Sequence, residues 1–361
     1  KWYGNQDFVI NWEDDGAEID NFDRAVIRNP DYYFREGVTW SDVSSKGFGV
    51  RYLPPGFVFD VKGSSGFPAT EQLLSVLSVM NSPWIGFALT LLNPTVSFQV
   101  GDISRVPFKQ PNAPQRERLE EMTRSAVRIQ QWESKVDETT FDFIAPLCWK
   151  DGLKSLAAAE VRLADLERQI DNEVYRLYGI TVADRAAIEA ELAGESPTDE
   201  DEIEPPMDRE ELAVRWISYA VGVVLGRFRP GVPGALGSGV YRREDFVVGS
   251  LPAPDEAEFD ELIGPPERFA YLDDAGGRHV FPTQVEAALH DLAVDDGIAV
   301  LDEGHPRDLP SLVRQALTLM LGDEAAQEVI VEGAGGDLHR FFEKSFFTKW
   351  HFKWYSVSRR K

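Results

Sequence analysis

Residues 34–67, FREGVTWSDVSSKGFGVRYLPPGFVFDVKGSSGF, decide how the first part of the chain folds. Apolar residues such as Val38, Trp40 and Phe57 lie among closely spaced glycines and prolines. This spacing is typical of short strands joined by tight turns, because glycine and proline interrupt helices and favour turns. The stretch therefore predicts a small β-rich lobe.

Basic and hydroxyl side chains are spaced along the same stretch, and such donors suit the phosphates and base edges of DNA. They make it a candidate recognition surface. Composition alone leaves a second interpretation open, a β-rich lobe with a solvated polar face. The candidate DNA-contacting residues here are Arg35, Ser41, Ser44, Ser45, Lys46, Arg51, Lys62 and Ser64.

The charge of the chain is large, negative and uneven. A length of 361 residues allows two or three domains, and a net charge of -24 argues against binding nucleic acid by bulk electrostatics. The acidic residues concentrate around 195–204 and 255–261, between prolines, as in solvated linkers. By contrast, residues 339–361 contain seven lysines and arginines and a single acid, Glu343. A local basic face is therefore compatible with the overall negative charge.

Other features of the composition limit the type of protein. No apolar run is long enough to cross a bilayer, so we expect a soluble, cytoplasmic protein with no membrane partner. The single cysteine, Cys148, excludes an internal disulfide framework, and we expect it to be buried. The five histidines are scattered, so no metal site is expected.

The first 110 residues alternate between strand-like and helical patterns. Short apolar pieces at 8–12 and 25–27 are predicted to be strands. Residues 71–80 have leucines at helical spacing and predict a helix that ends at an Asn-Ser-Pro sequence. Alternation at 95–98 predicts another strand, and residues 105–108 are interpreted as a closing strand or edge.

The rest of the chain is mainly helical. Apolar residues recur at three- and four-residue steps through 115–132 and 154–178, which predicts two long amphipathic helices. Further helices are predicted at 210–227, 283–292 and 309–321. The predicted fold class is α+β: a mixed α/β region, then long helices, then a mainly helical C-terminal region.

The C-terminal tail interleaves aromatic rings with cations, a combination that suits nucleic acid. An amphipathic helix that buries the rings and leaves the lysines in water explains the same pattern. Three further candidate DNA contacts are Lys109, which precedes the helical part, and Lys349 and Lys353 in the tail.

Two short motifs resemble catalytic ones but lack the context that they need. Residues 29–32, Asn-Pro-Asp-Tyr, differ in the third residue from the motif with which amino-methyltransferases hold a flipped base, and no glycine-rich cofactor loop follows an upstream strand. Asp31 with Asp60 and Lys62 mimics the half-motifs of a metal-dependent nuclease within a turn-rich segment. We therefore expect no catalytic residues in this chain.

Several longer segments resemble the carboxy-terminal half of the PglX family, the adenine-specific DNA methyltransferases of BREX phage defence, which are related to type IIG restriction-modification enzymes. The similar segments are KWYGN at 1–5, VINWE at 9–13, residues 33–51, GFVFD at 56–60, WES at 132–134, ETTFDF at 138–143, IDNEVYRLYG at 170–179 and ISYAVG at 217–222. The similarity is weaker across 255–305.

The resemblance implies an organisation and a function. Residues 1–110 would be a target recognition domain, 111–194 a helical spacer, 195–208 an acidic linker and 209–361 a mainly helical C-terminal domain. The chain would recognise double-stranded DNA and act as a scaffold for the N-terminal methyltransferase domain of the same protein. It would hold no cofactor itself, since S-adenosylmethionine binds in the catalytic half of such enzymes.

Two alternatives remain open from the sequence. The chain could be a protein-interaction module that docks other phage-defence components through its acidic surface, or the specificity part of a bifunctional type IIG restriction enzyme. The acidic composition favours the first alternative, and the basic residues of 34–67 do not.

Overall fold

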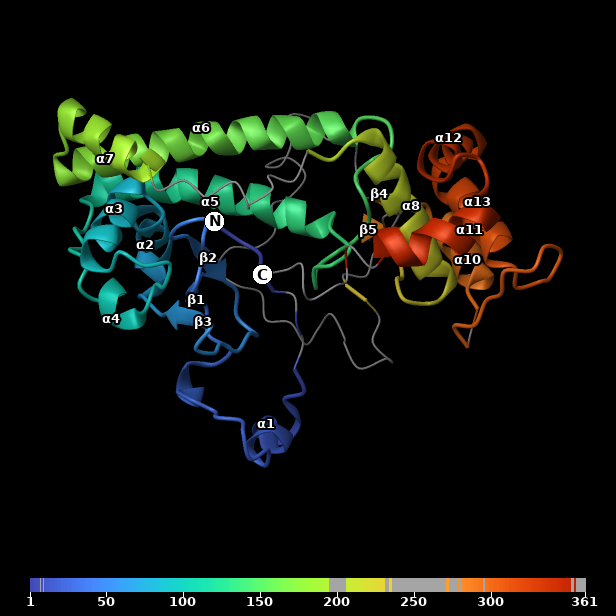
Figure 1. The fold of residues 1–361 in the computed structure, drawn as a ribbon, viewed down its shortest axis with the longest axis horizontal. Helices are drawn as coiled ribbons and strands as arrows, with labels where there is room; N and C mark the ends of the chain where they lie inside the picture. The colour runs from blue at the N-terminus through green and yellow to red at the C-terminus, as the bar shows by residue number, and fades with distance from the viewer. Residues whose placement is uncertain are drawn as a thin grey trace. The chain divides into compact units, whose positions relative to one another are not determined.

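A computed structural model describes residues 1–6, 8, 10–194, 206–230, 234–235, 271–272, 278–279, 281–294, 296–351 and 354 (Figure 1). It contains helices and small antiparallel sheets, which confirms the predicted α+β class. The chain forms two compact units. The first includes Lys1–Gln131 and the chain from Ala159 through helix α7, and the second includes Trp132–Ala158 and the described residues from 206 onward.

A three-stranded antiparallel sheet forms the centre of the first unit. Its strands are β1 (Gly37–Ser41), β2 (Val50–Leu53) and β3 (Gly63–Gly66), in the order β2-β1-β3. Side chains alternate between the faces of a strand, so Val38 and Trp40 are buried in the core while Thr39 and Ser41 lie on the opposite, half-exposed face. The short strands predicted for residues 34–67 are confirmed, but Phe57 lies outside them, because β3 begins only at Gly63.

The outer edge of β2 is closed by the N-terminal segment and by one amide side chain. The Trp2 backbone N–H donates to the Val50 carbonyl over 3.0 Å, and the Tyr52 N–H donates to the Trp2 carbonyl over 2.7 Å. The Asn81 side chain accepts from the Val50 N–H and donates to the Val50 carbonyl, both over 2.8 Å. Asn81 is 4% exposed, so this pair of bonds is shielded from water.

Three short helices cover the core face of the sheet: α2 (Leu73–Met80), α3 (Pro83–Leu92) and α4 (Val100–Ile103). Nearly every residue of α2 is buried, and Pro83 opens α3 at a position where its missing N–H costs nothing. Among the described residues no single helix is long and apolar enough to span a membrane; residues 70–80 and α3 pass that test only as a pair, which is bent by 73°.

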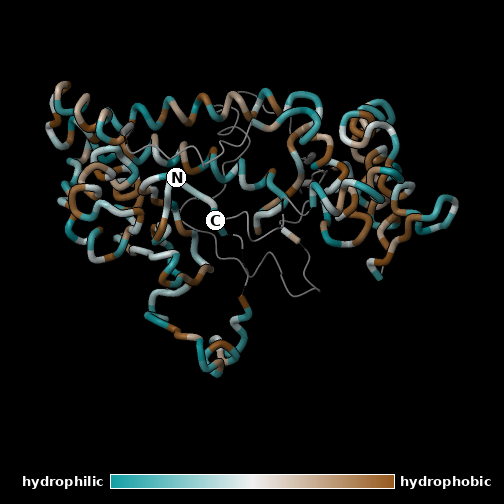
Figure 2. Tube along the Cα trace, in the orientation of Figure 1, coloured by the Kyte–Doolittle hydropathy of each residue, from teal (hydrophilic) through white to brown (hydrophobic). Residues whose placement is uncertain are grey.

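The helical part of the first unit comes from the long helices α5 (Ala113–Lys135) and α6 (Gly152–Tyr178) and from α7 (Val182–Gly194), which packs on α3. Figure 2 shows hydrophilic and hydrophobic residues alternating along α6, as expected of an amphipathic helix. Glu173, which is 4% exposed, accepts from Arg118 of α5 and from Arg176.

The second unit is built around α8 (Arg209–Val224), whose residues from Leu212 to Val224 are almost all buried. Helices α11 (Leu309–Leu321) and α12 (Asp323–Ala334) pack on it. Helices α10 (Thr283–Leu292) and α13 (Leu338–Phe341) and the π-helix η4 (Phe342–His351) complete its helical part. Two short strands, β4 (Tyr271–Leu272) and β5 (Arg278–His279), pair with each other.

Several predicted elements are wrong within the described residues. Neither residues 25–27 nor 105–108 form a strand, and no strand includes residues 10–12. Pro107 has no N–H to contribute to a ladder, and Val106 is buried beyond the end of α4 without strand pairing. Residues 95–98 contribute only an isolated bridge between Val43 and Ser97. Cys148 is partly exposed rather than buried.

We expect Asn81→Ala to destabilise the first unit. The change removes both bonds to Val50 and leaves a buried N–H without a partner, which costs about 2–4 kcal/mol in the free energy of unfolding. Chemical denaturation measures this loss. Asn21→Ala is the control, because Asn21 is exposed and its side chain donates one bond to the Ala17 carbonyl. Equal losses of unfolding free energy in the two variants would contradict the stabilising role of the two Asn81–Val50 hydrogen bonds.

Asp171 of α6 gives a pH-dependent prediction. Burial raises the pKa of its carboxyl to about 7; the nearby Lys1 ammonium opposes that rise and Glu167 adds to it. The folded state therefore keeps a proton that the unfolded chain releases at lower pH, so stability falls as pH rises from the unfolded pKa to about 7 and stays reduced above it.

Asp171→Asn removes this cost. We expect the free energy of unfolding to increase by about 1–3 kcal/mol near pH 8, with little gain near pH 3, where the carboxyl is mostly protonated in both states. Denaturation at the two pH values tests this, with Glu160→Gln on the exposed side of the same helix as control. A gain of equal size at both pH values would show that charge burial is not the cause.

Candidate nucleic-acid interface

One face of the sheet in the first unit is open and polar. Thr39 of β1 pairs with Arg51 of β2 on one side and with Ser65 of β3 on the other, so the three side chains form a row across the sheet. All three residues are half-exposed, whereas the opposite face is packed against the core. The row offers the Arg51 guanidinium and the hydroxyl oxygens of Thr39 and Ser65, which can still accept hydrogen bonds, on a rigid support.

Two of the predicted cations near this face have polar partners. The Arg51 Nη1 donates to the Ser41 hydroxyl over 3.3 Å, which brings together two predicted residues. The Lys62 ammonium lies 3.4 Å from a carboxylate oxygen of Asp42, with the lysine side chain 73% exposed. An exposed pair of this kind contributes little to stability, and the lysine can exchange its partner.

Asp60 has a structural role in the turn before β3. Its carboxylate accepts from the backbone N–H groups of Lys62 and Gly63 over 2.8 and 2.9 Å, as in an Asx-turn. Its Oδ1 is thereby occupied by the turn. No cluster of three or more histidine, cysteine, aspartate or glutamate residues that could hold a metal ion is found in the described ranges.

The remaining predicted residues of 34–67 lie at the ends of the strands. Ser44, Ser45 and Lys46 belong to the loop between β1 and β2, in which Ser45 and Lys46 are exposed. Ser64 is opposite Trp40 and therefore belongs to the core-facing side of β3; its carbonyl accepts from the Thr39 hydroxyl over 3.1 Å. The structure thus places the loop and the open face next to one another along β1.

An aromatic cluster lies at the Gly37 end of the open face. A Cβ at Gly37 would come within 2.9 Å of the Phe67 ring, so only glycine fits beneath this ring. Tyr32, 45% exposed, contacts Phe67 with ring centroids 5.2 Å apart, and the Arg35 guanidinium lies 5.2 Å from the Tyr32 ring centroid. The cluster also contains Trp12, Tyr33, Phe34 and Phe59.

The Asn-Pro-Asp-Tyr motif belongs to this cluster. Asn29 has a left-handed backbone with φ 54° and precedes the 3-10 turn η1 (Pro30–Tyr32), where its carbonyl accepts from the Tyr32 N–H. The motif therefore forms a tight turn that presents Tyr32.

The other predicted cations lie on different elements. The Lys109 backbone N–H donates to the Tyr178 hydroxyl over 2.9 Å, and its side chain is exposed before α5. Lys349 belongs to the second unit, where its ammonium lies 4.8 Å from the Trp350 ring centroid. Lys353 lies outside the described residues, as do most of the predicted acidic linker and the end of the tail.

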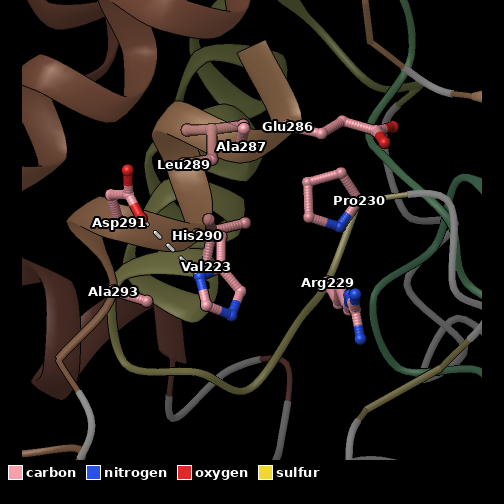
Figure 3. A pocket seen from close by; sticks show the side chains of 9 residues that line it. All are labelled: Val223, Arg229, Pro230, Glu286, Ala287, Leu289, His290, Asp291 and Ala293. Carbon is pink, nitrogen blue, oxygen red and sulfur yellow. Dashed lines mark ion pairs between the residues drawn. The ribbon is translucent and has the colours of Figure 1, made fainter. Parts of the chain in front are cut away.

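Two cavities lined by described residues are alternative candidate sites. Figure 3 shows a pocket of about 330 Å³ in the second unit, where His290 and Asp291 of α10 lie 3.9 Å apart with side chains 78% and 88% exposed. A hollow of about 390 Å³ between α5 and α6 is lined by three arginines, but Glu173 already pairs with two of them, Arg118 and Arg176. The titratable side chains of the first pocket are exposed, and the buried Glu173 of the second is already engaged in structural ion pairs, so we assign neither as a catalytic site.

Sequence reasoning missed two parts of this interface. It did not identify the contact between Tyr32 and Phe67 that supports the ring next to Arg35, because this contact joins residues on either side of the sheet strands. It noted Asn81 only as the end of a helix, whereas its amide holds β2. An amide residue directly after a buried, mainly apolar helix was the available signal.

No family model matches the chain. Two curated relatives do: the adenine-specific methyltransferase BrxX of Escherichia coli O9:H4 (strain HS), 29% identical over 353 residues, and the adenine-specific methyltransferase PglX of Lacticaseibacillus casei (strain Zhang), 31% identical over 258 residues. The alignments include 91% and 65% of this chain but only 26% and 20% of the relatives. The chain thus spans about a quarter or less of each relative's length, and it is a homologue of the PglX-like adenine-specific methyltransferases of BREX systems.

Proposed function

We propose that the chain is the DNA-recognition and scaffold region of an S-adenosylmethionine-dependent adenine-N6 DNA methyltransferase that acts in phage defence. The observation that carries the proposal is the open face of the first unit, where Arg51, Thr39 and Ser65 form a polar row beside exposed aromatic rings. The relationship to adenine-specific methyltransferases supports the choice of DNA as the ligand.

The chemistry of this face suits duplex DNA. Flexible exposed lysines such as Lys46 and Lys62 would neutralise phosphates as point charges. Guanidinium and hydroxyl groups held on strands would approach base edges, where donors and acceptors distinguish the base pairs. Such a division gives affinity through the backbone and specificity through the bases.

The chemistry of methyl transfer is proposed to lie elsewhere in the protein. The bound cofactor would supply the methyl group, and an adenine would be flipped out of the duplex to receive it. In the described part of the chain we assign no residue to the cofactor. The partners are then double-stranded DNA and the methyltransferase domain of the same protein, in the cytoplasm, with α5 and α6 as the spacer.

A protein-interaction module is the second candidate. It is favoured by the net charge of -24 and by large apolar side chains that are well exposed near the N-terminus, Phe8, Phe22 and Val26 at 72%, 63% and 68%. This candidate predicts no affinity for duplex DNA at low salt. The specificity part of a type IIG enzyme shares the DNA-binding surface and differs only in the chemistry of its other domains.

We expect Lys46→Ala to weaken binding to all duplexes to a similar extent. Loss of one phosphate contact should reduce the affinity by about three- to tenfold at low salt and reduce the slope of log affinity against log salt by about 1. Fluorescence anisotropy across a salt series measures both quantities. Lys154→Ala, an exposed lysine that pairs with Asp151, is the control. Unchanged affinity and slope for Lys46→Ala would place the phosphate contacts elsewhere.

We expect the chain alone to transfer no methyl group from S-adenosylmethionine to DNA. Incorporation of a radioactive methyl group into duplex DNA measures this activity, with the full-length parent protein as the positive control. Turnover by the chain alone would contradict the division between recognition and chemistry.

A further inference from the structure

The proposed DNA interface contains one arginine that differs from the other cations in how it is held. Arg35 directly precedes the sheet, and the residues before it are fixed by backbone bonds to the loop before β3. The Phe34 N–H donates to the Phe57 carbonyl over 2.8 Å, and the Gly56 N–H donates to the Phe34 carbonyl over 3.1 Å. Two backbone hydrogen bonds therefore hold the residue directly before Arg35 in place.

The backbone at this point adopts a rare conformation. Phe34 has φ 62°, in the left-handed region that bulky residues seldom adopt. Asn29, at the start of the same turn, is also left-handed with φ 54°. Conformations of this kind persist only where surrounding contacts enforce them, and they are enriched at functional sites. Here they direct Tyr32 and Arg35 toward each other at the surface.

The side chain of Arg35 lies over an aromatic ring. Its guanidinium lies 5.2 Å from the Tyr32 ring centroid, and Tyr32 is supported by Phe67, whose ring covers Gly37. Stacking on a ring restricts the guanidinium and leaves its edge of N–H donors free, so less entropy is lost when those donors bind a ligand.

Arg35 also differs from Lys62 and Arg51 in its polar contacts. In the described residues it is exposed and has no ion pair or hydrogen-bonded partner, and its neighbour Glu36 accepts instead from the Tyr52 hydroxyl. Lys62 pairs with Asp42, and Arg51 is half-buried and already donates to Ser41. Of these three cations, Arg35 combines a contact with an aromatic ring and donors that its contacts leave free.

We infer that Arg35 reads a guanine in the target sequence, with Tyr32 as its positioning residue. A restrained guanidinium presents two parallel donors that match the O6 and N7 acceptors of guanine in the major groove. A lysine keeps the charge and can reach the same acceptors, but it lacks the planar fork of two parallel donors and so discriminates less. The inference rests on the proposed DNA-recognition function and assigns one part of its sequence specificity to one side chain.

Selection from random DNA tests this inference and identifies the target sequence at the same time. The chain is incubated with a pool of random duplexes, and the bound DNA is recovered, amplified and sequenced. We expect the wild-type motif to contain a position that prefers guanine by about tenfold or more. Arg35→Lys and Tyr32→Ala should weaken that preference severalfold while keeping the rest of the motif, and Tyr32→Phe, which retains the ring, should keep the whole motif.

Arg28→Lys provides the matched control, because Arg28 is exposed a few residues earlier and has no ring contact or ion pair in the described ranges. Its motif should equal that of the wild type. An unchanged motif in Arg35→Lys would overturn the assignment of Arg35 while leaving DNA recognition intact. A wild-type chain that enriches no motif would overturn the proposed function and this inference together.

Discussion

The first unit depends on the pair of hydrogen bonds between the Asn81 side chain and the Val50 backbone. Asn81 terminates α2 and simultaneously acts as a substitute strand for β2, since its amide makes both bonds that a neighbouring strand would make. The Lys1 ammonium adds a bond to the Asn81 carbonyl over 3.2 Å. The Asn81 residue thus joins α2, the sheet and the N-terminal segment. The sheet packs against the core with one face, that of Val38 and Trp40. The opposite face is left available for a ligand.

Local charge explains how an acidic protein can present a surface for DNA. Salt screens exposed charges over about 8–10 Å at physiological ionic strength, so the nearest groups matter more than the total. Asp42 faces Lys62 and Glu36 is bonded to Tyr52, whereas Lys46 and Arg35 lack a carboxylate partner in the described part of the chain. A few unpaired cations of this kind would attract DNA only weakly through their charge alone. Binding would then depend more on specific contacts between fixed donors and the DNA.

Helices whose apolar residues recur every three or four positions were predictable from the sequence, because the buried face of a helix needs apolar residues at these steps. Helices α10 and α11 have the predicted limits, and α5, α6 and α8 agree within a few residues. Short apolar pieces failed as predictors: Val106 is buried without any strand pairing, so an apolar residue alone could not reveal backbone geometry. The residue types of the interface were predictable, but two of its contacts were not. Tyr32 meets Arg35 through an irregular turn that includes the left-handed Phe34, and Asp42 meets Lys62 because the ends of β1 and β3 are adjacent in the sheet.

The contact between Trp2 and Glu167 has a consequence for how the protein is made. The Trp2 indole N–H donates to the Glu167 carboxylate over 2.8 Å, across 165 positions of the chain. The first unit therefore includes its own N-terminal segment and part of α6, and it cannot be completed on the ribosome until α6 has emerged. Contacts of such long sequence separation slow folding, because a large loop must close before they form. During that interval Trp2, whose backbone covers the edge of β2, lacks its Glu167 partner, so fewer contacts hold this edge closed against pairing with another chain.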